Sequence, residues 1–195
     1  MIQPQFYIPD RINDIIFAYY QRDSIAFTYY YTHCIKVTEL ALKLSEKNKH
    51  LNLDKEFILF GSMLHDIGII QTNAPEIGCF GEFPYIAHTY LGRQMLEKEG
   101  LAGIALVCER HIGTGLSKED IIAANFPLPH YDMIPLSYEE KLICYADKFY
   151  SKSEKHLTTP RTLDKIRKKI IKYGEDKLEK FDDLVALFGS VEELI

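Results

Sequence analysis

Histidine and aspartate residues that could bind metal ions occur on otherwise apolar stretches of this sequence. His65 and Asp66 are adjacent and end an apolar segment that begins at Phe57. The other candidates lie at helical spacing from rows of hydrophobic residues, where burying an unpaired polar group is costly; they are His33, His88, His111 and Asp147. Six such residues indicate one buried site.

The six side chains supply four imidazoles and two carboxylates, without a thiolate. This donor set suits one or two divalent ions, with Fe or Mn preferred and Ni, Zn or Mg as alternatives, and we expect Asp66 to be the shared carboxylate. Two such ions close together lower the pKa of a water between them, generate hydroxide at neutral pH and neutralise charge on a phosphoryl group. The predicted chemistry is hydrolysis without a nucleophilic side chain.

The elements that must position these residues are predicted to be helices, because apolar residues recur at helical spacing and capping residues mark helix starts. The predicted helices span residues 12–20, about 25–47 after Asp23 or Ser24, 57–65, 85–99, 102–111, 121–124, a segment opened by Ser137, another opened by Thr159 and Pro160, and 175–188. Gly68 is expected to end the third helix as its C-cap.

Two capping boxes are predicted, Ser117 with Asp120 and Ser137 with Glu140. Residues 71–84 contain two prolines and two glycines, so we expect a loop that shapes substrate access. The β-branched residues fall within helical periods, and the predicted fold class is therefore all-α.

Composition restricts the class of protein further. No apolar run reaches the roughly 18 residues that cross a bilayer, and the N-terminus lacks the regions of a signal peptide, so we expect a cytoplasmic protein without a membrane partner. The four cysteines form no Cys-x-x-Cys pair, which predicts unpaired thiols. A net charge of −5 disfavours a nucleic-acid partner, because proteins that follow a nucleic-acid backbone carry a basic patch.

The order of these residues resembles the H…HD…D signature of the HD-domain metal-dependent phosphohydrolases, in the subgroup named for the sequence HDIG. The resemblance covers about residues 25–152 and rests on His33, on His65-Asp66-Ile67-Gly68 and on Asp147. His88 and His111 stand where binuclear members, including the HD-GYP phosphodiesterases, have two further histidines.

The resemblance implies a helical bundle with the metal site at its centre. His33, His65, Asp66 and Asp147 would hold one ion, and Asp66, His88 and His111 the other. We expect one domain over residues 1–195, with C-terminal helices at about 160–190 packing on the motif-bearing core. The Gly-Tyr-Pro signature is absent, and Ile69 replaces the lysine that often follows HDIG, so a cyclic dinucleotide is not the expected substrate.

Basic residues next to the predicted ligands are candidates for binding a substrate phosphate. Lys148 follows Asp147 and Arg110 precedes His111, with Arg93 as a more distant third. Together with Asp66, Lys148 and Arg110 are the predicted catalytic residues. The basic run at 165–172 is interpreted as a solvated helix face.

Three functions remain open at this stage. The leading hypothesis is a phosphohydrolase or phosphodiesterase of a small phosphorylated molecule, expected to be a nucleotide. A second is a di-iron oxygenase, because six-ligand HD proteins resembling myo-inositol oxygenase activate O2. A third is a non-catalytic sensor domain, and a homo-oligomer is compatible with each.

Overall fold

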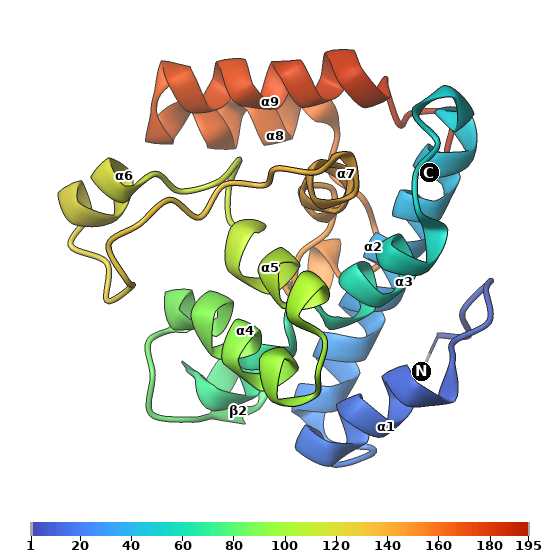
Figure 1. The fold of residues 1–195 in the computed structure, drawn as a ribbon, viewed down its shortest axis with the longest axis vertical. Helices are drawn as coiled ribbons and strands as arrows, with labels where there is room; N and C mark the ends of the chain where they lie inside the picture. The colour runs from blue at the N-terminus through green and yellow to red at the C-terminus, as the bar shows by residue number, and fades with distance from the viewer. Residues whose placement is uncertain (1, 195) are drawn as a thin grey trace.

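The structure, a computed structural model, describes residues 2–194 and is built almost entirely of helices (Figure 1). The α-helices are α1 (Asp10–Tyr19), α2 (Ile25–Lys47), α3 (Lys55–Leu64), α4 (His88–Lys98), α5 (Ala102–Arg110), α6 (Lys118–Ala123), α7 (Tyr138–Asp147), α8 (Leu163–Ile170) and α9 (Glu175–Phe188). Short 3₁₀ helices lie between them, at Lys49–Leu51 (η1), Ile67–Gln71 (η2), Pro75–Ile77 (η3), Tyr85–Ala87 (η4), Glu154–His156 (η5) and Ile171–Tyr173 (η6). The predicted all-α class is confirmed.

A small sheet forms within the segment predicted to be a loop. Strands β1 (Asn73–Ala74) and β2 (Cys79–Phe80) pair antiparallel, with Asn73 opposite Phe80. Two-residue strands are too short to produce a period of two in the sequence, and the prediction therefore missed them.

The predicted starts of α2, α5, α7 and α9 are correct, whereas those of α1, α3, α4 and α6 differ from the structure by two or three residues. Capping side chains are engaged at several helices. The Ser24 hydroxyl accepts from the backbone N–H of Phe27 at the start of α2, and Ser117 and Asp120 form the predicted capping box. The second predicted box is only half correct. Ser137 does cap α7, but the carboxylate of Glu140 accepts from the backbone N–H of Leu136 instead.

The start predicted at Thr159 and Pro160 is wrong. Helix α8 begins at Leu163 and is capped by Thr162. The backbone N–H of Arg161 donates to the carbonyl of Phe149 over 2.7 Å, which ties this part of the chain to the segment after α7. Helix α8 can therefore begin only after Arg161.

The prediction that Gly68 is the C-cap of α3 is also wrong. Helix α3 ends at Leu64, and Gly68 lies inside η2. A Cβ atom at Gly68 would lie 2.2 Å from the carbonyl oxygen of His88 and 2.5 Å from the backbone nitrogen of Gly92. The glycine is needed because η2 lies directly against α4, and no side chain fits between them.

The apolar core has two main parts, and α2 belongs to both. One part joins α1, α3, α4 and α5 to the first half of α2. The other joins α7, α8 and α9 to the second half of α2. Figure 1 shows α8 and α9 lying side by side above α7, and the ring of Tyr145 in α7 contacts Phe181 and Phe188 of α9.

Two predictions from composition concern the whole chain. All four cysteines are buried and free, as expected. Within residues 2–194, the structure contains no helix whose length and hydropathy would let it cross a membrane.

Candidate metal centre

The six predicted ligands come from five segments, and most stand at helix ends. His33 lies in the middle of α2, whereas Asp147 is the last residue of α7 and His88 the first residue of α4. His65 and His111 are the C-cap residues of α3 and α5. Residues far apart in the sequence thus meet where several helices converge.

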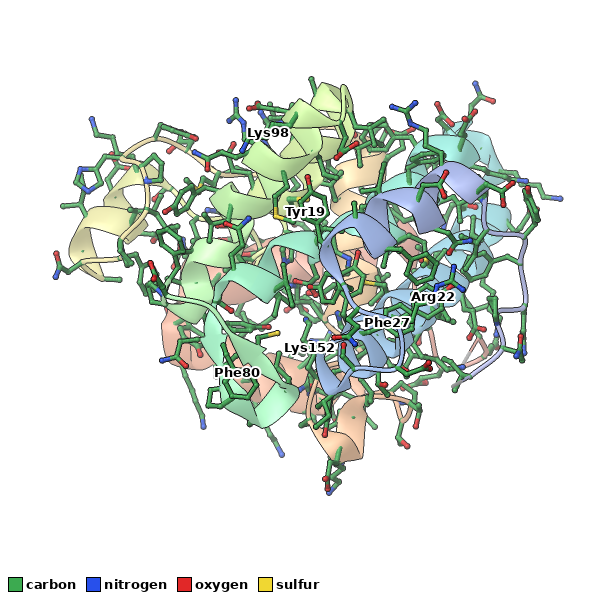
Figure 2. The ribbon with its side chains drawn as sticks, turned by 90° about the horizontal axis from the view of Figure 1, so that it is seen from below. Tyr19, Arg22, Phe27, Phe80, Lys98 and Lys152 are labelled. Carbon is green, nitrogen blue, oxygen red and sulfur yellow. The ribbon has the colours of Figure 1, made fainter. Side chains whose placement is uncertain are left out.

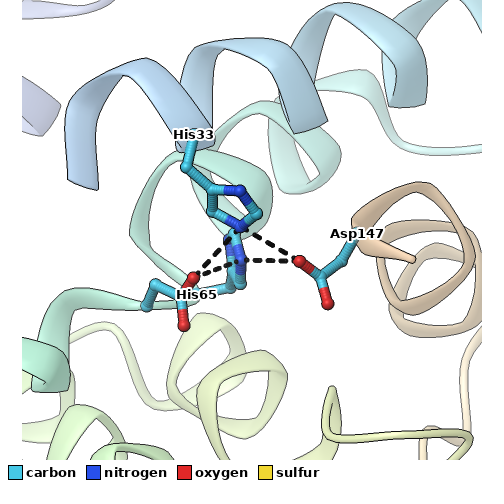
Figure 3. Close-up of side chains that lie close together, drawn as sticks. His33, His65 and Asp147 are labelled. Carbon is cyan, nitrogen blue, oxygen red and sulfur yellow. Dashed lines mark ion pairs between the residues drawn. The ribbon is translucent and has the colours of Figure 1, made fainter. Parts of the chain in front are cut away.

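The first group of ligands contains His33, His65, Asp66 and Asp147, whose ligand atoms all lie within 4.8 Å of one another. The Nε2 atom of His33 is 3.0 Å from Asp147 Oδ1 and 3.2 Å from Asp66 Oδ2. The Nε2 atom of His65 is 3.0 Å from the same Asp66 oxygen. Figure 3 shows His33 and Asp147 reaching from α2 and α7 toward His65.

The second group contains Asp66, His88 and His111, again within 4.8 Å. The Oδ1 atom of Asp66 lies 3.3 Å from His88 Nε2 and 3.5 Å from His111 Nε2. Asp66 therefore directs one oxygen toward each group, which is the arrangement of a bridging carboxylate.

Three of the imidazoles are oriented by their own backbone. Each directs Nδ1 at the carbonyl oxygen three residues earlier: His65 at Ser62 (2.8 Å), His88 at Tyr85 (2.5 Å) and His111 at Cys108 (2.8 Å). A carbonyl can only accept, so Nδ1 carries a proton, and in the neutral ring Nε2 keeps its lone pair. These side chains are held in the tautomer that binds a metal through Nε2.

Unsatisfied polar atoms at the centre fit a metal ion. Both ring nitrogens of His33, the Nε2 of His65 and both oxygens of Asp66 are buried without a hydrogen bond among residues 2–194, although the ion pairs above bring several of them close together. Burying such atoms unpaired is costly, and lone pairs that converge without hydrogen-bond geometry are typical of an ion-binding centre. The residues present therefore fit one or two divalent ions.

The protonation states also suit metal binding. Burial lowers the pKa of His88 to about 3 and also lowers that of His111, so both are neutral. Burial opposes ionisation of Asp66, but the charges of His65 and Lys152 outweigh it and hold the pKa of that carboxyl well below its usual range. Asp147 is kept ionised in a similar way by Lys148. Burial likewise opposes a charge on His65, but the carboxylate of Asp66 raises the pKa of His65 well above its usual range, so an ion that binds there must displace the Nε2 proton of His65.

Of the two predicted phosphate-binding residues, Lys148 lies beside the metal ligands and Arg110 does not. The ammonium of Lys148 donates to Asp147 Oδ2 (2.8 Å) and to the carbonyl of His111 (2.9 Å), at the edge of both ligand groups. The guanidinium of Arg110 instead donates to both carboxylate oxygens of Glu140, at 3.0 and 3.1 Å, and turns away from the centre. Arg93 likewise binds Glu97 and Glu109.

Sequence reasoning missed Lys152, whose ammonium forms an ion pair with Asp66 Oδ2. Its side chain is only 12% exposed, and Figure 2 labels it near the middle of the view. Lys152 follows α7 in an irregular segment, so no helical period indicated its direction. Only its closeness in sequence to Asp147 could have identified Lys152 as a residue of the site.

A cavity of about 450 Å³ opens beside the ligands. Its wall includes His33, Asp66, His88, His111 and Asp147 together with Lys148 and Lys152, but not Arg110. Thr114 also belongs to this wall, and its hydroxyl is buried without a hydrogen-bond partner among the described residues. The cavity is of a size that accepts a small molecule.

The chain is similar to parts of three known proteins. An uncharacterised protein of Methanocaldococcus jannaschii is 37% identical over 118 residues, which is 59% of this chain and 62% of that protein. Proteins named tRNA (cytidine(56)-2'-O)-methyltransferase from Thermoplasma volcanium and Picrophilus torridus are 27% and 26% identical, over 89% and 80% of this chain. The match covers only 46% and 42% of those two proteins, so the chain spans about half the length of the curated relatives it matches.

No solved structure matches the chain significantly. The family model described as the HD domain matches residues 30–151, which is more than half of the chain and includes all six candidate ligands. Together with the convergence of these ligands in space, this match establishes that the chain belongs to the HD domain family.

Proposed function

We propose that this protein is a metal-dependent phosphohydrolase that acts on a small phosphorylated molecule, with a nucleotide as the expected substrate. The observation that carries the proposal is the position of Asp66. Its two oxygens serve two separate ligand groups, and both groups face a cavity whose wall also carries Lys148 and Lys152. Such a site combines metal ligands with positive charge where a phosphate would lie.

Divalent ions bound by these residues would polarise a phosphoester and activate water. The chain itself supplies the other interactions. Lys148 offers an ammonium held in place by Asp147 and by the His111 carbonyl, and such a charge attracts phosphate oxygens. Thr114 offers a buried hydroxyl without a partner among the described residues, which can donate to a substrate oxygen.

The names of two relatives bear on the substrate class. Both are named as methyltransferases that act on cytidine in tRNA, a nucleotide within a polymer, so the names are compatible with a nucleotide substrate but do not indicate a small one. The match covers less than half of each of those proteins, so methyl transfer is not part of the proposal.

The test is the variant Asp66→Ala, with elemental analysis and a phosphoester panel applied to the same preparation. We expect both metal content and phosphate release to be lost, because Asp66 belongs to both ligand groups. Asp183→Ala is the matched control, since Asp183 is exposed on α9 and far from the ligand set. Asp66→Asn preserves the side-chain volume if the alanine variant folds poorly.

Two outcomes would contradict the proposal. One is undiminished hydrolysis by folded Asp66→Ala. The other is oxygen consumption by the iron-loaded protein without phosphate release from any phosphoester, which would favour the oxygenase chemistry of the HD superfamily.

A further inference from the structure

The cavity wall contains more basic residues than the two ligand carboxylates, Asp66 and Asp147, can pair with. Although the whole chain has a net charge of −5, five basic residues belong to the cavity wall: Lys148, Lys152, Arg161, Lys169 and Lys177. Three of them are ion-paired, Lys148 with Asp147, Lys152 with Asp66, and Lys177 with Asp120. Among residues 2–194, Arg161 and Lys169 have no carboxylate within 4.0 Å.

Arg161 is fixed in place with donors to spare. Its Nη1 atom donates to the carbonyl oxygens of Tyr150 (2.8 Å) and, more weakly, Lys148 (3.4 Å), just after the end of α7. No hydrogen bond within the described residues uses its Nε or Nη2 atoms. A guanidinium held by carbonyls in this way is oriented before any ligand arrives, and its planar fork suits a phosphate or carboxylate.

Lys169 extends from α8 toward the same region. Its neighbours Ile166 and Ile170 are buried and line the cavity with it. Partial burial of Lys169 lowers its pKa, and the positive charges of Arg161 and Lys148 lower it further, against the opposing effect of the Asp147 carboxylate. These cations therefore lie close enough to repel one another, and an anion between them would relieve that repulsion.

Apolar side chains also belong to the cavity wall. Ile170 is the last residue of α8, Tyr173 lies in η6, and Leu116 and Phe126 flank α6. An aromatic or aliphatic part of a ligand would fit against these side chains.

We propose that Arg161 and Lys169 form a second anion-binding subsite, so that the substrate carries two anionic groups joined by an apolar or aromatic part. This inference rests on the proposed function for its first anionic group, the phosphoryl group at the metal centre. The second group is a phosphate or a carboxylate. A cavity of about 450 Å³ holds a small molecule with two charges, and a bisphosphorylated nucleoside is the type of compound that fits.

The test compares Lys169→Met with Lys168→Met. Both lysines are exposed on α8 and lack an acidic partner among the described residues, but only Lys169 belongs to the cavity wall. With manganese-loaded protein, kcat/KM is measured for adenosine 5′-monophosphate and adenosine 3′,5′-bisphosphate. We expect Lys169→Met to lower kcat/KM about tenfold for the bisphosphate, which loses one charged hydrogen bond. The monophosphate does not reach the subsite, and its kcat/KM should fall less than about twofold. Lys168→Met should leave both unchanged.

A second measurement does not depend on catalysis. Inorganic phosphate is titrated into EDTA-treated full-length protein and followed by NMR, and we expect Lys169→Met to weaken binding about tenfold relative to Lys168→Met. Equal effects of the two variants in both measurements would overturn the subsite while leaving the hydrolase intact. Lys169-dependent phosphate binding by a protein that hydrolyses no phosphoester would support the subsite and refute the proposed function.

Discussion

Replacing Gly68 by alanine should disrupt the second group of ligands and leave the first in place, without unfolding the protein. The ideal Cβ of such an alanine would lie 2.2 Å from the carbonyl oxygen of His88, whereas ordinary van der Waals contact begins at 3.4 Å. The difference is 1.2 Å, and the obstructing atoms belong to backbone, which cannot rotate away as a side chain would. Helix η2 and the start of α4 must therefore move apart.

This displacement acts mainly on the second group of ligands. His88 is the first residue of α4 and moves with it, so its Nε2 atom leaves its present distance of 3.3 Å from Asp66 Oδ1. His33, His65 and Asp147 are on other elements and keep their positions, and we expect Asp66, the residue directly before η2, to stay with His33 and His65. With the proposed site loaded with two ions per chain, one in each group, we expect metal content to fall from two to one in this variant. Overpacking of this kind costs about 3 kcal/mol, which lowers Tm by roughly 6–12 °C for a chain of this size.

The assay is elemental analysis combined with thermal unfolding, and Gly103→Ala is the matched control. Gly103 lies in α5, and the nearest atom to its ideal Cβ is 3.8 Å away, so alanine fits there without displacement. That variant should keep both ions and be as stable as the parent, or slightly more so, because alanine favours a helix. Two ions per chain and an unchanged Tm in Gly68→Ala would refute the reasoning.

Two further predictions concern side chains at and near the site. Thr114→Val should leave Tm unchanged or slightly higher, because the hydroxyl has no hydrogen bond to lose within residues 2–194. The same variant should lower kcat/KM about tenfold, because the substrate loses a hydrogen-bond donor. Full activity of the variant in a phosphoester assay would contradict this prediction. Glu140→Gln should lower the free energy of unfolding by about 2 kcal/mol, measured with urea, because the carboxylate binds both Arg110 and the backbone N–H of Leu136. Metal content should stay the same in this second variant, and a loss of ions would show that Arg110 and Glu140 act on the metal centre.

The ligands could be predicted from the sequence because helical spacing reveals the direction of a side chain. His33 and Asp147 lie in line with buried apolar residues of their own helices, and polar groups in such positions need a partner. The same reasoning fails for neighbours of a ligand. Arg110 precedes His111, but successive residues on a helix point about 100° apart, and Arg110 faces Glu140 instead.

Residues outside regular helices could not be predicted in this way. Lys152 and Arg161 follow α7 in irregular chain, and their directions depend on carbonyls and carboxylates brought near by the fold. Lys169 lies on a helix whose own pattern resembles a solvated face, and only the packing of α8 beside α7 places it at the cavity. Gly68 gave a helix-stop signal, although the true reason for a glycine is a close contact with α4.

The orientation of the imidazoles has a consequence for how the centre assembles. His65, His88 and His111 are each steered by a carbonyl of their own helical turn, so the encoded geometry exists before any ion arrives. His33 has no such anchor, since neither of its ring nitrogens is hydrogen-bonded among the described residues. Loading should thus be ordered: His88 and His111 are held by hydrogen bonds to carbonyls and should bind their ion first, whereas His33 is held only by packing and by its ion pairs with Asp66 and Asp147.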